Sequence, residues 1–396
     1  MIIAPKVRDF LCLTAHPEGC RKNVEKQIEY VRSQGEIEGN AKKVLVIGCS
    51  TGYGLASRIV AAFGGGADTL GIMFEKPAKG KRTATPGWYN TAAFEEFAAK
   101  EGKYAKTING DAFSQEVKDQ TIEMIRQDFG KVDAVVYSLA APRRKAPDGV
   151  TYNSVLKTTG EEFTNKNLNL KNNTIEMKSI PAATEEEIEA TVKVMGGEDW
   201  KLWMEALNEA GVLSENAVTV AYSYIGPEIT YPIYFEGTIG AAKKDLHKAA
   251  AQITEELKDQ GVRAYISVNK GLVTQASAAI PIVPLYMALL YKVMKEKGLH
   301  EGCIEQMERL FKDKKLLADA ITDENGWIRM DDWEMKDEVQ EEVKRLWEIV
   351  DTDNITEYGD IDGYWDDFYH MFGFREEGVD YDADVDPAVA IPSLEA

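Results

Sequence analysis

The sequence has few of the residues that usually carry metal or disulfide chemistry. Its 396 residues include only four cysteines and four histidines. No Cys-x-x-Cys pair, His-x-x-x-His pair or Cys/His cluster occurs, so neither a structural nor a catalytic metal site is expected. Four scattered cysteines do not make a disulfide framework in so long a chain, and reduced thiols predict a cytoplasmic location.

Long hydrophobic runs and excess positive charge are lacking too. The most apolar stretch, from Ala278 to Leu290, is interrupted by Pro281 and Pro284 and is too short to span a bilayer. The N-terminus does not show the basic-then-apolar pattern of a signal peptide. With 46 basic and 66 acidic residues the net charge is −20, which repels nucleic acid and anionic membranes. We therefore expect no nucleic-acid partner and no stable membrane association.

What the chain does have is a regular alternation of short apolar segments and helical patterns. Strands are expected at residues 43–47, 69–74, 104–108, 132–138, 217–222 and 263–268, and helices at 54–63, 94–100 and 115–129. This alternation predicts an α/β fold built on a doubly wound parallel sheet of the Rossmann type. Ligands of such sheets bind at the carboxyl ends of the strands.

No linker-like composition divides the chain, so one large domain with additions is expected. Residues 143–203 are polar and show little periodicity except for a helical pattern at 185–195, and we expect them to be an insertion that covers the substrate. Residues after 300 are expected to form extra helices rather than strands of the sheet. The predicted parts are an N-terminal extension at 1–41, a core at 42–290 that contains the insertion, and a helical extension at 291–396.

A glycine-rich turn follows the first predicted strand and opens the first predicted helix. Its three glycines have the spacing G-x-x-x-G-x-G, which differs from the common G-x-G-x-x-G fingerprint. Such glycines permit a tight turn, and the helix N-terminus offers free N–H groups to a pyrophosphate. The turn predicts a dinucleotide site formed by Gly48, Ser50, Thr51, Gly52, Tyr53 and Gly54.

An acidic residue ends the second predicted strand. Glu75 lies 21 residues past Gly54, close to the spacing at which a carboxylate binds the adenosine ribose hydroxyls. Because a carboxylate there repels a 2′-phosphate, it favours NADH over NADPH, although a solvated acid at a strand end is the plain alternative. Other residues at strand ends are expected to contact the cofactor: Phe74, Asp111, Ala112, Leu139 and Ala140.

The glycine pattern resembles the short-chain dehydrogenase/reductase superfamily, but the usual Tyr-x-x-x-Lys is not in the expected place. The one such pair, Tyr291 and Lys295, falls in an apolar helix after the sixth strand, and we interpret it as coincidence. After the fifth strand come Tyr224, Tyr234 and Lys243, and the last two are separated by eight residues. This Tyr-x8-Lys arrangement resembles the family of trans-2-enoyl-CoA reductases and single-chain bacterial enoyl-acyl-carrier-protein reductases.

Other segments resemble the same family over nearly the whole chain. They are HPEGC, GWYN, YSLAAPRR, VMGGEDW, SVNKGLVTQAS, YKVMKEKG and HEGCIEQ. The resemblance implies NADH-dependent reduction of the C2–C3 double bond of a trans-2-enoyl thioester, carried by coenzyme A or by acyl carrier protein. It gives no reason to expect a flavin.

The resemblance also implies roles for individual residues. Tyr234 would hydrogen-bond the enolate that develops on the thioester oxygen and supply a proton. Lys243 would lower the pKa of that phenol and bind the nicotinamide ribose. Tyr224 would be a second hydrogen-bond donor to the substrate. Val273 and Thr274, after the sixth strand, would contact the cofactor.

Two further segments are candidates for substrate contact. Residues 278–286 would cover the acyl chain, with Ile280 and Ile282 facing it, although a plain core segment explains the same apolar sequence. The basic residues 143–145 would meet coenzyme A phosphates, or would simply form a solvated turn.

Three other functions remain open at this point. They are a reductase of the same fold that acts on a carbonyl group, a nucleotide-sensing protein without catalysis, and a methyltransferase. The lack of a correctly placed Tyr-x-x-x-Lys argues against the first, and the Tyr234–Lys243 pair argues against the second. A monomer is expected, because the inserted segments can cover the sheet. The sequence does not separate coenzyme A from carrier-protein substrates or fix the acyl chain length.

Overall fold

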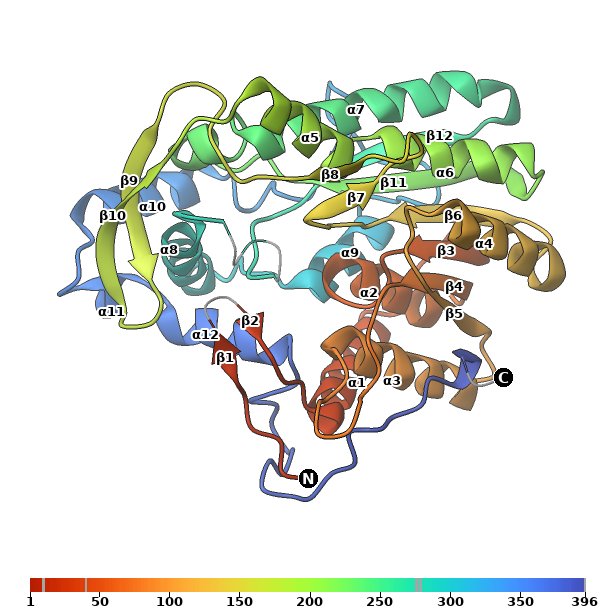
Figure 1. The fold of residues 1–396 in the computed structure, drawn as a ribbon, viewed down its shortest axis with the longest axis horizontal. Helices are drawn as coiled ribbons and strands as arrows, with labels where there is room; N and C mark the ends of the chain where they lie inside the picture. Colours follow the sequence, from red (N-terminus) through yellow and green to blue (C-terminus); the bar gives the residue numbers. More distant parts are fainter. Residues whose placement is uncertain (9–10, 40, 275–276, 278–279, 395–396) are drawn as a thin grey trace.

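A seven-stranded parallel sheet forms the centre of the protein in this computed structural model, which describes residues 1–8, 11–39, 41–274, 277 and 280–394. The strand order is β13-β12-β11-β6-β3-β4-β5, and every neighbouring pair is parallel (Figure 1). The strands are β3 (Lys43–Ile47), β4 (Asp68–Met73), β5 (Ala105–Asn109), β6 (Val132–Tyr137), β11 (Leu213–Ser223), β12 (Arg263–Val268) and β13 (Trp327–Arg329). The predicted doubly wound fold is confirmed.

The sheet is covered on both faces, which is why its central strands are continuous apolar runs. One core contains Val44 and Val46 of β3 with the helices α1 (Pro17–Ser33), α2 (Gly52–Ile59), α3 (Pro86–Lys100) and α9 (Cys303–Lys312). The other contains Leu45 and Ile47 with the helices α4 (Gln115–Asp128), α6 (Glu198–Glu209) and α7 (Thr238–Glu256). Alternate side chains of one strand thus stabilise the two layers of helices.

The polar insertion consists of two hairpins and a helix. The strands β7 (Arg143–Lys145) and β8 (Thr151–Asn153) pair antiparallel, as do β9 (Phe163–Asn169) and β10 (Thr174–Ile180). These hairpins were not predicted, because their strands are mostly polar and only β10 shows a short alternation, at Ile175 and Met177. Helix α5 (Glu185–Met195) has the predicted bounds and begins at a capping box in which Thr184 and Glu187 bond each other's backbone.

The C-terminal third contributes more than helices. It contains α8 (Val283–Glu296), α10 (Asp337–Ile349), α11 (Ile355–Tyr358) and α12 (Ile361–His370), which share a core with the β9–β10 hairpin. It also contains β13, which pairs with β12 through residues 327–329. The expectation of helices alone after residue 300 was wrong on this point, because a strand of three residues is too short to show a periodic pattern.

Short elements complete the chain. They are β1 (Val7–Arg8), β2 (Leu11–Cys12), the π-helical turn η1 (Val60–Gly64) and the 3-10 turns η2 (Glu228–Ile233), η3 (Lys258–Gln260) and η5 (Pro392–Leu394). In the described part of the chain, no helix has the length and hydropathy of a membrane span.

Candidate active site

The glycine turn after β3 has a backbone that only glycine allows. Gly48 has φ of 85°, and a Cβ atom there would lie 2.2 Å from the carbonyl oxygen of Ser138 at the end of β6. A Cβ atom on Gly54 would lie 1.9 Å from the carbonyl oxygen of Gly48. These two glycines therefore let the turn close against β6 and against itself.

The third glycine of the turn faces open space. Gly52 has φ of 54°, and an added Cβ atom would meet nothing within 4 Å. It is the first residue of α2, whose N-cap residue Thr51 makes no side-chain cap bond, and no acidic residue stands in the first turn. A free helix N-terminus of this kind carries partial positive charge and suits an anion such as a pyrophosphate.

Glu75 is held next to this turn. Its Oε1 accepts a hydrogen bond of 2.6 Å from the hydroxyl of Ser50, and Asn109 bonds the backbone N–H and C=O of Glu75 at 2.8 and 3.0 Å. Gly87, at the start of α3, makes room for the carboxylate, because a Cβ atom there would lie 2.0 Å from Oε1. Sequence reasoning did not single out Gly87, although it lies in the GWYN segment. The neighbouring Phe74 is 78% exposed.

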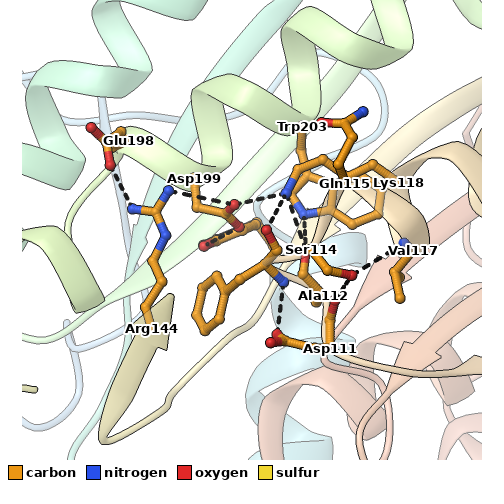
Figure 2. A network of polar contacts seen from close by, with 12 residues as sticks. Asp111, Ala112, Ser114, Gln115, Val117, Lys118, Arg144, Glu198, Asp199 and Trp203 are labelled. Atoms are coloured by element: carbon orange, nitrogen blue, oxygen red, sulfur yellow. Dashed lines mark hydrogen bonds and ion pairs between the residues drawn. The ribbon is translucent and has the colours of Figure 1, made fainter. Parts of the chain in front are cut away.

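The loop after β5 is ordered by its own side chains. The Asp111 carboxylate accepts the N–H of Phe113 at 3.0 Å, and the Ser114 hydroxyl caps α4 by accepting the N–H of Val117. The carbonyl oxygen of Ala112 accepts bonds from Trp203 and Lys118. Figure 2 shows that these contacts tie the loop to α4 and α6. After β6, the side chain of Leu139 lies beside Gly48, and Ala140 is exposed.

A buried ion network anchors the insertion to the same region (Figure 2). Asp199 of α6 accepts bonds from Lys118 at 2.9 Å and from the hydroxyl of Tyr137 at 3.1 Å. Arg144 of β7 donates to Glu198 at 2.7 Å and is only 2% exposed. The expectation that Arg144 meets a phosphate or forms a solvated turn was therefore wrong, because its charge is neutralised inside the protein.

The residues on either side of Arg144 behave differently. Arg143 and Lys145 are exposed, as the alternation of side chains along β7 requires. They remain available to an anionic ligand.

The two tyrosines that follow β11 are packed against each other. The rings of Tyr224 and Tyr234 meet edge to face with centroids 4.8 Å apart. Gly240 of α7 permits the approach of the loop that carries Tyr234, since a Cβ atom there would lie 2.5 Å from the carbonyl oxygen of Tyr234. The structure thus brings together two residues that the sequence placed ten apart.

Lys243 projects from the second turn of α7 towards β11. Its ammonium donates a hydrogen bond of 2.8 Å to the carbonyl oxygen of Tyr222. Burial lowers the pKa of Lys243 to about 8. Burial also raises the pKa of Tyr234, with Glu334 as a smaller cause. Lys243 was expected to lower the pKa of this phenol, but the pKa of Tyr234 is raised, by burial and Glu334, and Lys243 has no part in the shift.

Glu334 was not foreseen from the sequence and lies at the centre of the site. Its Oε1 accepts hydrogen bonds from the hydroxyls of Tyr224 at 2.8 Å and Tyr286 at 2.6 Å, and its Oε2 accepts the N–H of Gly271 at 2.7 Å. Burial raises the pKa of Glu334, while nearby Lys270 and these donors act in the opposite direction. No local pattern marks this residue, because its partners lie 110, 48 and 63 residues away.

The segment after β12 is held by α8 and by its own turn. The N–H of Val273 donates to the hydroxyl of Tyr291 at 3.0 Å, and the N–H of Thr274 donates to the hydroxyl of Ser277 at 2.8 Å. Tyr291 in turn donates to Asp367, and Lys295 donates to Asp360. The Tyr291–Lys295 pair therefore serves packing, as the sequence interpretation held.

The predicted acyl-chain cover is buried. Ile280 and Ile282 are 5% and 0% exposed, while Ala278 and Ala279 lie outside the described residues. Ile282 has φ of 71°, a strained conformation for a β-branched residue, and its N–H donates to the side chain of Asn167 in β9 at 2.9 Å. The insertion is thus tied to this segment, and its contact with an acyl chain stays a prediction.

Within the described residues, no group of three or more His, Cys, Asp or Glu side chains is arranged to hold a metal ion.

Three family models match the chain. Residues 82–316 match the trans-2-enoyl-CoA reductase catalytic region, residues 2–80 match the NAD(P)H binding domain of trans-2-enoyl-CoA reductase, and residues 322–385 match the enoyl reductase FAD binding domain. The first model alone spans more than half of the chain.

Curated proteins and solved structures agree with these models. The chain is 56% identical over its full length to the whole of an NADH-dependent enoyl-[acyl-carrier-protein] reductase of Flavobacterium johnsoniae, and 54% identical to the whole of a trans-2-enoyl-CoA reductase [NADH] of Ruminiclostridium cellulolyticum. It is 47% identical to a Clostridium acetobutulicum trans-2-enoyl-CoA reductase solved with NADH, with a TM-score of 0.95 over 98% of both chains. The Treponema denticola trans-2-enoyl-CoA reductase, solved with NAD, gives 49% identity and a TM-score of 0.93 over 97% of this chain and 98% of that one.

Proposed function

The chain belongs to the trans-2-enoyl-CoA reductase family, and from this premise we propose that it uses NADH to reduce the C2–C3 double bond of a trans-2-enoyl thioester. The product is the saturated acyl thioester. The observation that supports this function most is the ring contact of Tyr224 and Tyr234 just after β11, at the edge of the sheet that also carries the glycine turn. Lys243 is bonded to the backbone of Tyr222 near the same end of β11.

The residues present suit a dinucleotide. The open space at Gly52 and the free N-terminus of α2 fit a pyrophosphate, and the carboxylate of Glu75, steadied by Ser50, fits the adenosine ribose hydroxyls. Lys243 would hold the nicotinamide ribose. NADH held there would supply a hydride to C3 of the substrate, and negative charge would then develop on the thioester oxygen.

Tyr234 is the proposed proton donor to that charge. Its phenol is protonated at neutral pH, since an ordinary phenol has a pKa of about 10 and burial raises that of Tyr234 further. A positioned donor of this kind stabilises an enolate by hydrogen bonding. Among the contacts of the described residues, its hydroxyl has no hydrogen-bond partner within the protein, so it is free to bind the substrate oxygen.

The substrate class is an acyl thioester, and both carriers occur in the names of the relatives. We propose that Ile280 and Ile282 contact the acyl chain and that exposed Arg143 and Lys145 lie where carrier phosphates can approach. The experiment is an assay of NADH oxidation at 340 nm with crotonyl-CoA, a longer enoyl-CoA and the matching enoyl-acyl carrier protein. Activity with none of the three substrates contradicts the proposed function.

The segment that matches an FAD-binding model does not fit that cofactor. Residues 322–385 contain 22 acidic and five basic residues, a balance that disfavours a pyrophosphate. Three of the arginines are already paired with carboxylates: Arg329 with Asp331, Arg345 with Glu342 and Arg375 with Asp366. We therefore assign no step to a flavin, and the visible absorption spectrum of the purified protein tests this directly.

We further propose that the protein acts as a monomer in the cytoplasm. Its cysteines are free thiols, and three of the four are buried, which agrees with a reducing compartment. Sedimentation of the purified chain and fractionation of its host cells test the two statements.

A further inference from the structure

One carboxylate oxygen of Glu334 accepts hydrogen bonds from two phenols, and this limits what those phenols can donate to a substrate. A tyrosine hydroxyl has a single hydrogen. When Tyr224 donates that hydrogen to Glu334 at 2.8 Å, its oxygen can only accept further hydrogen bonds. The same holds for Tyr286, which donates to the same carboxylate oxygen at 2.6 Å.

We propose that Glu334 is a positioning residue of the reductase, which fixes Tyr224 as a hydrogen-bond acceptor and so leaves Tyr234 as the phenol that donates to the substrate. This inference rests on the proposed function of Tyr234. It assigns opposite roles to two tyrosines whose rings are in edge-to-face contact.

The turn after β13 and the glycine at position 271 fix the place of the Glu334 carboxylate. Glu334 follows β13, where the backbone N–H groups of Met330 and Asp331 donate to the carbonyl oxygen of Val268 at 2.8 and 3.0 Å and fix the turn against β12. Gly271, which donates to Oε2 of Glu334, also makes room for the phenol, because a Cβ atom there would lie 3.0 Å from the Tyr224 hydroxyl.

Burial of the 0% exposed Glu334 side chain raises its pKa, and its polar neighbours oppose that effect. Its oxygens receive three hydrogen bonds, and the nearby ammonium of Lys270 favours the ionised form. Lys270 is itself buried and donates to the carbonyl oxygen of Gly271 at 3.0 Å. An ionised carboxylate can only accept hydrogen bonds, which sets the direction of the bond from Tyr224.

The position of Glu334 also gives the C-terminal segment a part in the reaction. Residues 322–385 supply the seventh strand and then this carboxylate, which reaches the ends of the neighbouring strands β11 and β12 through Tyr224 and Gly271. The contribution of this segment is thus to orient phenols, for which a flavin is not needed.

Two substitutions separate this role from simple packing. Glu334→Gln keeps the volume of the side chain, but its amide can donate to Tyr224 and turn the phenol hydrogen towards the substrate. Glu334→Asp keeps the acceptor, although it is one methylene shorter. If Glu334 acts as an acceptor, kcat falls further in Glu334→Gln, by about 10- to 100-fold, than in Glu334→Asp, and the KM for NADH stays near that of the wild type.

A purely structural role predicts the reverse order. The isosteric Glu334→Gln would then be the milder change, and the cavity left by Glu334→Asp would be the more harmful one. Thermal unfolding measured on the same samples shows how much stability each variant has lost.

Glu95 offers a matched control. It is 2% exposed and, like Glu334, accepts two hydroxyls and one backbone N–H, from Thr107 and Ser393. It lies on α3 and has no contact with either active-site tyrosine among the described residues. Glu95→Gln should therefore lower stability without the large loss of kcat.

A double-mutant cycle with Tyr224→Phe completes the test. If Glu334 acts through Tyr224, then Glu334→Gln or Glu334→Asp causes no further loss of kcat once the phenol hydroxyl is gone. The cycle with Glu334→Asp decides the question if Glu334→Gln does not fold. Losses that multiply in the double variant, or a normal kcat in folded Glu334→Gln, overturn the inference. An inactive wild type would instead overturn the proposed function.

Discussion

Replacing Lys243 with methionine should strongly lower activity and also change how the stability of the protein depends on pH. Burial lowers the pKa of Lys243 from its ordinary value of 10.5 to about 8. In the unfolded chain the ammonium titrates at the ordinary value, so below pH 8 both states are charged and the native state carries the full cost of burying the charge. That cost disappears as pH rises from 8 to 10.5.

The size of the effect follows from the two pKa values. The cost is roughly 3 kcal/mol at pH 7 and falls below about 1 kcal/mol at pH 10. With an unfolding entropy of roughly 2.1 cal/mol/K per residue, a chain of this length changes its Tm by about 1 °C for each 0.8 kcal/mol. The Tm of Lys243→Met minus that of the wild type should therefore be about 3 °C greater at pH 7 than at pH 10.

Comparing the Tm difference at the two pH values removes effects that do not depend on pH, such as the lost hydrogen bond to Tyr222. His247, which lies near Lys243, does not interfere, because burial lowers its pKa to about 4. Lys244, the next residue on α7, is exposed and serves as the control: Lys244→Met should show the same Tm difference from the wild type at both pH values. Differential scanning calorimetry measures the Tm, and NADH oxidation at 340 nm should fall at least about 100-fold in Lys243→Met. An equal Tm difference at pH 7 and pH 10 would refute the reasoning on burial.

Five other substitutions test separate parts of the protein. Glu75→Ala should narrow the preference for NADH over NADPH in kcat/KM, and a wild type that uses both equally would argue against the ribose contact. Tyr234→Phe should lower kcat by about 100- to 10,000-fold, and near-normal turnover would move the proton donor elsewhere. Ile280→Ala or Ile282→Ala should raise kcat/KM for a longer enoyl-CoA relative to crotonyl-CoA, whereas an unchanged ratio in folded protein would make these residues plain core. Asp199→Ala should lower the free energy of unfolding by about 3 to 5 kcal/mol in urea titrations, because Lys118 then stays buried without its carboxylate partner. A loss below about 1 kcal/mol would mean that this ion pair is as weak as one exposed to solvent.

The sequence alone determined the parts of the fold that depend on neighbouring residues. The bounds of β3 and β12 agree with the predicted ones. In β3 the reason is plain, because a short apolar run reports burial on both faces of a parallel sheet. The glycine turn was equally visible, since Gly48 and Gly52 are needed for their own backbone angles. The Tyr234–Lys243 pair was found through spacing and resemblance, and its role is still a prediction.

Only the tertiary structure decided how charged residues and short elements are used. From the sequence, Arg144 was expected to meet a coenzyme A phosphate or to lie on a solvated turn. The fold instead buries it beside Glu198, which lies 54 positions away. Glu334 was not singled out from the sequence, whereas in the folded protein its carboxylate accepts a hydrogen bond from Tyr224. The physical reason is that periodicity reports whether a segment is buried, but a buried polar side chain is stabilised by its hydrogen-bond partners. Those partners come from distant parts of the chain, so local sequence carries no record of them.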